Sequence, residues 1–264
     1  MIGHVINLDR AAARWQSVSR IAAERGLLVE RLPAADGRAP WAAPAAARAG
    51  MPPAEVACFE SHRRAWRRIA EGPDPAGLVL EDDVWLAEGI TAVLESIEDL
   101  MQGLDLVKLN AHPRGMIVAS RPVAEVPGCR LLRPAQGTSD SSAYVISRAF
   151  AAWALVLHAD PWRALDLALF DPATGARIAQ ADPGLAVQQR HADFRFLDEQ
   201  ASRTEIQPDR SRPLPGARPR GWAAVRREAE RFRRRRLLPA MQPLLNLRRP
   251  PEARLEFRRI RFLG

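Results

Sequence analysis

The chain has 264 residues, of which 47% are hydrophobic, so it is long enough for one large α/β domain or for one domain with an appendage. We expect no membrane-spanning helix and no secretory signal, because no apolar run approaches the ~18 residues that a span needs and the N-terminus lacks the layout of a leader. The net charge of +8 is unevenly spread: residues 211–264 contain sixteen Arg and four Glu, which leaves −4 on residues 1–210.

The first elements predict a βαβ unit. Residues 4–8 are typical of a strand, residues 11–24 carry apolar side chains at helical spacing, and residues 27–32 predict a second strand. The loop after the first strand of such a unit lies beside a ligand. Its residues Asn7, Arg10 and Arg14 are therefore candidates to contact a diphosphate or a nucleoside, with two solvated helix arginines as an equally good interpretation.

The next segment predicts a surface excursion or lid over 39–53, followed by a helix over 54–70. This helix contains Cys58 and His62. A lone histidine in a helix is more often a packed or capping residue than a ligand. Cys58 and Cys129 give neither a disulfide framework nor a metal-ligand spacing, so a reducing cytoplasm is the simplest location.

An apolar run at 78–80 then ends in three consecutive acids. Side chains alternate along a strand, so Glu81 and Asp83 are expected on one side and Asp82 on the other. Open α/β sheets bind ligands at the carboxyl ends of their strands. Three adjacent negative charges repel one another unless a cation or hydrogen-bond donors offset the cost. The alternative is a solvated strand end.

Beyond the acids the pattern alternates between helix and strand. The predicted helices are 90–101 and 148–158, and the predicted strands are 104–109, 143–147 and 185–189. Residues 111–136 are expected to be irregular or to form a hairpin, and residues 171–184 are expected to be a loop. Lys108 shares a strand face with Leu106, so it either snorkels or reaches into a site. His191 follows the last predicted strand, where a surface histidine is the commoner interpretation.

The C-terminal part predicts a linker over 208–221 and then a helix with an apolar face and an arginine-rich face. Such an extension is either a solvated basic segment or an attachment to an anionic inner-membrane surface, and we favour the second because apolar and basic faces coexist. Nucleic acid is not expected as a partner, because aromatic residues are not interleaved with the basic ones.

Several of these pieces, in this order, resemble glycosyltransferase family 25, which includes lipopolysaccharide galactosyltransferases and procollagen galactosyltransferases. The matching pieces are Val5-Ile6-Asn7-Leu8 with Arg14, Ala35-Asp36-Gly37, Glu55-Val56-Ala57-Cys58-Phe59-Glu60-Ser61-His62 with Trp66, Leu80-Glu81-Asp82-Asp83, Lys108-Leu109-Asn110, Thr138 with Ala143-Tyr144-Val145-Ile146-Ser147, Asp166, and Pro183-Gly184-Leu185 with Gln188-Gln189. One departure is Ala57, where the family usually has glycine before the cysteine. We expect it to alter helix packing slightly and to leave the chemistry intact.

The resemblance implies a GT-A-like nucleotide-sugar-binding domain over 1–207, with a mixed, mainly parallel sheet, and a basic helical C-terminal extension over 208–264. In such folds an acidic motif holds a divalent metal on the diphosphate of the donor, and carboxylate oxygens suit Mn²⁺ or Mg²⁺. The expected ligands are Asp83 first and Glu81 in support, with His191 as a further candidate. Asp82 is expected to meet the ribose or an acceptor-side group.

The resemblance also implies an inverting transfer of galactose or glucose from a UDP-sugar to a cell-envelope glycan or glycolipid, such as a lipopolysaccharide or lipooligosaccharide. That reaction needs a general base, for which Asp166 is the preferred candidate and Asp140 the second. Lys108, Arg10 and Arg14 are expected at the diphosphate or nucleoside. The alternatives are a metal-dependent phosphoryl-transfer or hydrolase enzyme, and a non-catalytic relative that binds glycan or membrane.

Overall fold

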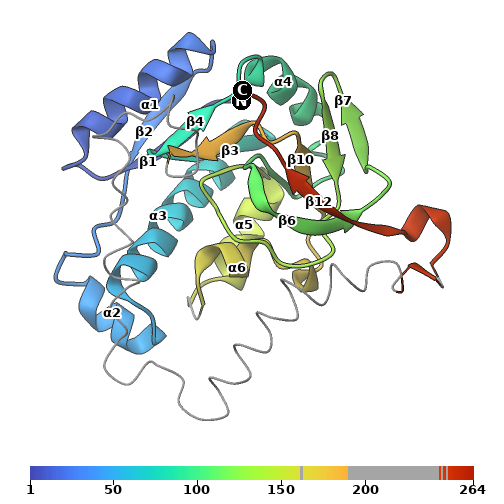
Figure 1. The fold of residues 1–264 in the computed structure, drawn as a ribbon. Helices are drawn as coiled ribbons and strands as arrows, with labels where there is room; N and C mark the ends of the chain where they lie inside the picture. The colour runs from blue at the N-terminus through green and yellow to red at the C-terminus, as the bar shows by residue number, and fades with distance from the viewer. Residues whose placement is uncertain (161–162, 190–243, 245, 248) are drawn as a thin grey trace.

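The computed structural model describes residues 1–160, 163–189, 244, 246–247 and 249–264. In this part of the chain an eight-stranded sheet is covered by helices on both faces (Figure 1). Along β3 (Ala76–Glu81), Leu78 and Leu80 point into one core, whereas Val79 points into the other. The sheet is therefore buried on both sides, as an α/β protein requires.

The large sheet has the spatial order β2-β1-β3-β9-β5-β10-β8-β7. Its other strands are β1 (Gly3–Asn7), β2 (Val29–Pro33), β5 (Leu106–Lys108), β7 (Ala124–Val126), β8 (Cys129–Leu132), β9 (Ala143–Ser147) and β10 (Ile178–Asp182). The strand β1 pairs in parallel with β2 and β3, and β10 pairs in parallel with β5. The other four pairings are antiparallel, so the sheet is mixed, as expected, with less parallel pairing than predicted.

Two helices cover one face of the sheet and three cover the other (Figure 1). The first two are α1 (Ala12–Glu24) and α4 (Ile90–Leu100), and the other three are α3 (Pro53–Ala70), α5 (Arg148–Leu157) and α6 (Leu165–Leu169). Each long helix buries an apolar stripe, and Pro53 begins α3 at a position where its missing N–H costs nothing. Within these described residues, no helix is long and apolar enough to cross a membrane.

Three segments differ from the sequence-based expectation. The excursion at 39–53 contains the helix α2 (Ala42–Ala49), which packs on α3 through Ala46, Met51 and Val56. The segment 111–136, expected to be irregular or a hairpin, contains the antiparallel pair of β7 and β8 that a hairpin requires, and also the longer strand β6 (His112–Ala119). The loop predicted over 171–184 begins with a 3-10 turn (Pro172–Thr174) but contains β10, a fully buried strand that completes the sheet between β5 and β8.

The end of the chain also departs from the prediction of a helical extension. After a 3-10 turn (Pro251–Ala253), β12 (Leu255–Ile260) pairs antiparallel with β6, and Ile260 packs with Met116, Val118 and Leu132. The strand predicted to be the last is β11 (Ala186–Gln188), which pairs with β4 (Val84–Leu86). Residues 208–243 of the predicted extension lie outside the described residues.

Candidate functional site

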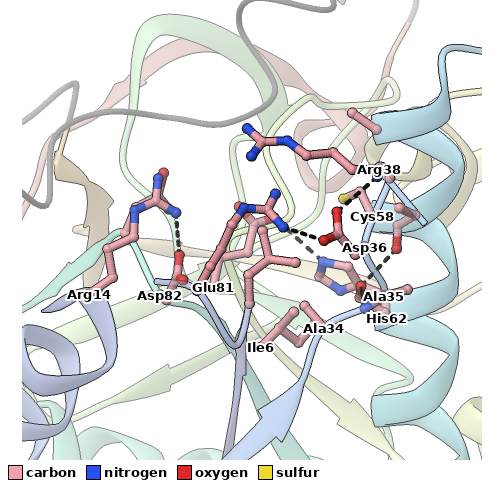
Figure 2. A pocket seen from close by; sticks show the side chains of 17 residues that line it. Ile6, Arg14, Ala34, Ala35, Asp36, Arg38, Cys58, His62, Glu81 and Asp82 are labelled. Carbon is pink, nitrogen blue, oxygen red and sulfur yellow. Dashed lines mark hydrogen bonds and ion pairs between the residues drawn. The ribbon is translucent and has the colours of Figure 1, made fainter. Parts of the chain in front are cut away.

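A cleft of about 750 Å³, counting the solvent-open space at its mouth, lies at the carboxyl ends of β1 and β3. The loop after β1, the segment after β2, one face of α3 and the end of β3 form its walls (Figure 2). Parallel β1 and β3 end beside each other, so residues distant in sequence meet here. Five of the residues predicted to form the site line the cleft: Arg10, Arg14, Glu81, Asp82 and Asp83.

The first acidic group is centred on Asp82, which lies in the turn between β3 and β4. Its carboxylate accepts hydrogen bonds from Asn7 Nδ2 and Arg14 Nη1, both at 2.7 Å. Figure 2 shows the contact with Arg14. Burial raises the pKa of Asp82, while Arg14 and Asn7 oppose that rise. Asn7 is itself held by Arg31, whose Nε donates to Asn7 Oδ1 at 2.7 Å. Three predicted nucleotide-site residues, Asn7, Arg14 and Asp82, are therefore one hydrogen-bonded cluster.

The second acidic group consists of Glu81 and Asp83. Gln188 on β11 brings them together, because its Nε2 donates to Glu81 Oε2 at 3.3 Å and to Asp83 Oδ1 at 3.5 Å. The side chains of Glu81 and Asp83 thus face the same point, and Asp82 faces away from it. Burial, together with the charges of Glu81 and Asp82, raises the pKa of Asp83 to about 8.

A third group contains both candidate bases. Asp166 in α6 accepts the backbone N–H of Asp140 at 3.0 Å, and Asp140 Oδ1 accepts from the hydroxyl of Ser142 at 2.7 Å. Asp140 has a left-handed backbone, with φ of 78°. Burial raises its pKa, Lys108 opposes the rise and Glu81 adds to it. The Asp140 carboxylate therefore belongs to the same electrostatic environment as Glu81.

Lys108 lies with this third group and not with Asn7 and Arg14. Its ammonium is fully buried, donates to Thr138 Oγ1 at 3.1 Å and to the carbonyl oxygen of Ser139, and sits over the ring of Phe170. Burial lowers the pKa of Lys108 to about 8. Of the two interpretations of this lysine, the structure excludes snorkelling to solvent.

Two further predicted residues are less central. Arg10 lines the cleft and forms an ion pair with Asp36, which also accepts the backbone N–H of Arg38 at 2.8 Å. His191 lies outside the described residues, so its proposed metal role stays a prediction.

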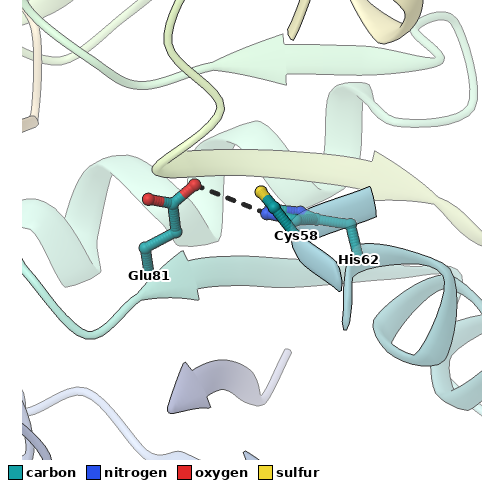
Figure 3. Close-up of side chains that lie close together, drawn as sticks. All are labelled: Cys58, His62 and Glu81. Atoms are coloured by element: carbon teal, nitrogen blue, oxygen red, sulfur yellow. Dashed lines mark ion pairs between the residues drawn. The ribbon is translucent and has the colours of Figure 1, made fainter. Parts of the chain in front are cut away.

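The sequence did not single out Cys58, His62 or Gln188 as functional. Cys58 and His62 are four residues apart on α3, and their ligand atoms lie within 4.8 Å of one another and of Glu81 (Figure 3). Their spacing on a predicted helix could have indicated a shared face. His62 is packed, as expected, with its Nδ1 at 2.9 Å from the hydroxyl of Tyr144. Gln188 is part of a motif that resembles family 25, but the residues next to it in the sequence do not indicate that it contacts Glu81 and Asp83.

Residues 1–114 match the model of glycosyltransferase family 25, described as an LPS biosynthesis protein family. The matched part contains the Asn7–Arg14–Asp82 cluster, the cysteine and histidine of α3, and the acidic end of β3. The resemblance to family 25 is confirmed over these residues. No curated protein sequence matches the chain.

Among solved structures, the chain is similar to a glycosyltransferase involved in glycosylation of the major capsid of PBCV-1, with 12% identity over 76% of this chain and 98% of that one and a TM-score of 0.38. It is also similar to an active-site mutant of LgtC, with 11% identity over 87% of this chain and 94% of that one and a TM-score of 0.38. A putative glucose-1-phosphate thymidylyltransferase from Bacillus anthracis shows 8% identity, coverage of 68% and 86%, and a TM-score of 0.36. These likenesses are distant, and the family 25 match carries more weight.

Proposed function

We propose that the protein is a metal-dependent inverting glycosyltransferase that moves galactose or glucose from a UDP-sugar to a cell-envelope glycan, such as a lipopolysaccharide or lipooligosaccharide acceptor. One observation carries the proposal. Two carboxylates at the carboxyl end of β3 face a common point in the cleft, beside a separate cluster of Asn7, Arg14 and Asp82. The first group suits a cation, and the second offers donors to an anion or a ribose.

The residues present fit a divalent metal. Asp83 is buried next to two other acids, and burial in the first place and the charges of Glu81 and Asp82 in the second raise its pKa to about 8. A divalent cation would offset the cost of a charged carboxylate there, and carboxylate oxygens are the ligands that Mn²⁺ and Mg²⁺ prefer. Asp83 and Glu81 would hold the ion, leaving coordination positions for phosphate oxygens and water.

The chemistry then divides among the three groups of residues. When bound, the metal would neutralise charge that develops on the departing diphosphate, which is worth several kcal/mol in comparable enzymes. Arg14, held by Asp82, would orient the nucleoside diphosphate at the opposite wall. A carboxylate of the third group would take the proton from the acceptor hydroxyl, with Asp166 as the first candidate and Asp140 as the second.

The decisive experiment measures binding and transfer with UDP-galactose and UDP-glucose, with and without Mn²⁺. We expect metal-dependent donor binding that is lost in Asp83→Ala and kept in Asp99→Ala, a matched change at an exposed acid on α4. Unchanged donor binding in Asp83→Ala would contradict the assignment. Release of UDP at full rate without any acceptor would indicate a hydrolase, and binding without turnover would indicate a non-catalytic relative.

We also propose that the arginine-rich part of residues 208–264 attaches the enzyme to an anionic inner-membrane surface, where a glycolipid acceptor is found. The support is its charge, since residues 211–264 carry sixteen Arg and four Glu. Truncation is an unsuitable test, because it removes β12 from its pairing with β6.

Replacing Arg233 to Arg236 by serine in the full chain keeps that strand. We expect this variant to bind phosphatidylglycerol vesicles less than the parent chain, with no binding of either to phosphatidylcholine vesicles. Equal binding of both chains to the anionic vesicles would contradict the attachment.

A further inference from the structure

A thiol and an imidazole on the α3 wall of the cleft converge with a carboxylate at the end of β3. Cys58 and His62 are separated by four residues, so the helix places them on one face, and this face looks toward the end of β3 where Glu81 lies (Figure 3). The Sγ, ring-nitrogen and carboxylate-oxygen atoms of the three residues all lie within 4.8 Å of one another.

The imidazole of His62 is held in a ligand-like orientation. Its Nδ1 lies 2.9 Å from the hydroxyl of Tyr144, which also accepts the indole N–H of Trp66 at 2.8 Å. This contact fixes the ring and leaves Nε2 directed at Glu81, 3.4 Å from Oε1. An outer-shell hydrogen bond on one ring nitrogen, with the other nitrogen free to coordinate, is the usual arrangement of a metal-bound histidine.

The second observation is the state of His62 Nε2. The side chain is fully buried, and Nε2 has no hydrogen-bond partner among the described residues. Its contact with Glu81 Oε1 at 3.4 Å is an ion-pair contact and not a hydrogen bond. A buried polar atom that makes no hydrogen bond is costly, and the binding of an ion at that atom is one explanation. A cation between Nε2, the thiolate and the carboxylate would satisfy this nitrogen.

The donor set selects the ion. One sulfur, one nitrogen and one oxygen ligand suit Zn²⁺, whereas Mn²⁺ and Mg²⁺ prefer oxygen ligands alone. Zinc–ligand bonds of about 2.0–2.3 Å place tetrahedral ligands about 3.3–3.8 Å apart, so small side-chain movements would close the site. All three residues line the cleft, which leaves a fourth position open to solvent or to a ligand.

We propose that Cys58, His62 and Glu81 form a zinc site in the wall of the cleft, separate from the oxygen-ligand site centred on Asp83. The two sites share Glu81, so zinc and the metal of the proposed glycosyl transfer compete for one carboxylate. Zinc would therefore inhibit the proposed transfer. The zinc site itself does not depend on that function, because metal binding can be measured directly.

The test uses the full chain, stripped of metal, and titrates it with Co²⁺ as a spectroscopic substitute for Zn²⁺. We expect one equivalent of Co²⁺ to give a thiolate-to-cobalt charge-transfer band that one equivalent of Zn²⁺ abolishes and Mn²⁺ does not. Cys58→Ser should lose the band and bind Zn²⁺ about 100-fold more weakly. The matched variant Cys129→Ser should keep both, because Cys129 is buried in another core and its thiol pKa is raised to about 11.

A second readout needs no variant. Cys58 is partly exposed and Cys129 is buried, so iodoacetamide should alkylate Cys58 first, and Zn²⁺ but not Mn²⁺ should slow that reaction. The absence of a charge-transfer band in the unaltered chain, its retention in Cys58→Ser, or unchanged alkylation with Zn²⁺ would each overturn the zinc site. A zinc site without any sugar transfer would leave this inference intact and contradict only the proposed function.

Discussion

Two neighbouring acids in the cleft have different environments. Burial raises the pKa of Asp82, but hydrogen bonds from Arg14 and Asn7, at 2.7 Å each, oppose that rise. Asp83 is buried beside Glu81 and Asp82, and Arg14 only partly counters their effect, so its pKa rises to about 8. Both residues are aspartates, and the residues that surround them in the fold give their carboxylates different properties.

Asp82 therefore belongs to the architecture of the cleft, whereas Asp83 is suited to a ligand. A carboxylate that is already paired stabilises the cleft and orients Arg14. A carboxylate held among like charges is unfavourable until a cation binds.

The largest effect is expected from Asp83→Asn. We expect transfer activity to fall by about 10³-fold or more, because an amide cannot replace a metal-binding carboxylate in a site that stabilises transition-state charge. Asp82→Asn should retain more activity and should keep Mn²⁺-dependent donor binding. The measurement is kcat/KM of both variants with the better donor sugar. Equal losses of kcat/KM in the two variants would contradict the different roles assigned to Asp82 and Asp83.

The candidate bases come next. If Asp166 takes the acceptor proton, Asp166→Asn should lower kcat by about 10²-fold or more and remove the acidic limb of the pH–rate profile. In that case Asp140→Asn should lower activity but keep the acidic limb of the pH–rate profile, because Asp140 would only position Asp166, which accepts its backbone N–H. The opposite pattern would make Asp140 the base. Pre-steady-state rates over a range of pH separate the two.

A change at Arg14 tests the ion pair between Arg14 and Asp82. Arg14→Gln leaves Asp82 buried without its ion pair, so we expect the free energy of unfolding to drop by about 3 kcal/mol. The double variant with Asp82→Asn should recover part of that loss, because the uncompensated charge is gone. Denaturant unfolding of the four chains in this cycle gives the coupling energy, and a coupling near zero would show that the pair contributes nothing.

Lys108 is the cationic counterpart of Asp83, since burial lowers its pKa to about 8. The unfolded chain binds the Lys108 proton more tightly than the folded chain between about pH 8 and 10.5, so this residue makes stability rise as pH rises through that window. We expect about 2 kcal/mol of such a rise between pH 7.5 and 9.5, relative to Lys108→Met. Denaturant unfolding of both chains at these pH values is the measurement, and parallel pH profiles would contradict it.

Local pattern was enough to predict the acids and much of their scaffold. The apolar run before Glu81 and the alternation of side chains along a strand placed Glu81 and Asp83 on one side and Asp82 on the other. The rule about strand ends placed these acids, and separately the loop with Asn7 and Arg14, at a ligand site. The helical spacing in 54–70 predicted α3, apart from its first residue. In each case the information lies within one or two turns of chain.

What the sequence did not predict depends on partners far along the chain. The strand β10 contains Ala179, Gln180 and Ala181, which have little β preference of their own, and its pairing with β5 fixes it as a strand. The convergence of Cys58 and His62 with Glu81 likewise requires α3 to pack beside the end of β3. The roles of Gln188 and Tyr144 follow from tertiary packing alone.

The pairing of β12 with β6 changes how the arginine-rich stretch should be classified. Residues 189–254 connect two strands, β11 and β12, that both belong to the described fold. In topological terms this stretch is an insertion and not an appendix. Because the cost of closing a loop grows only slowly with its length, such an insertion can lengthen or shorten between homologues while both of its ends stay attached to the same domain.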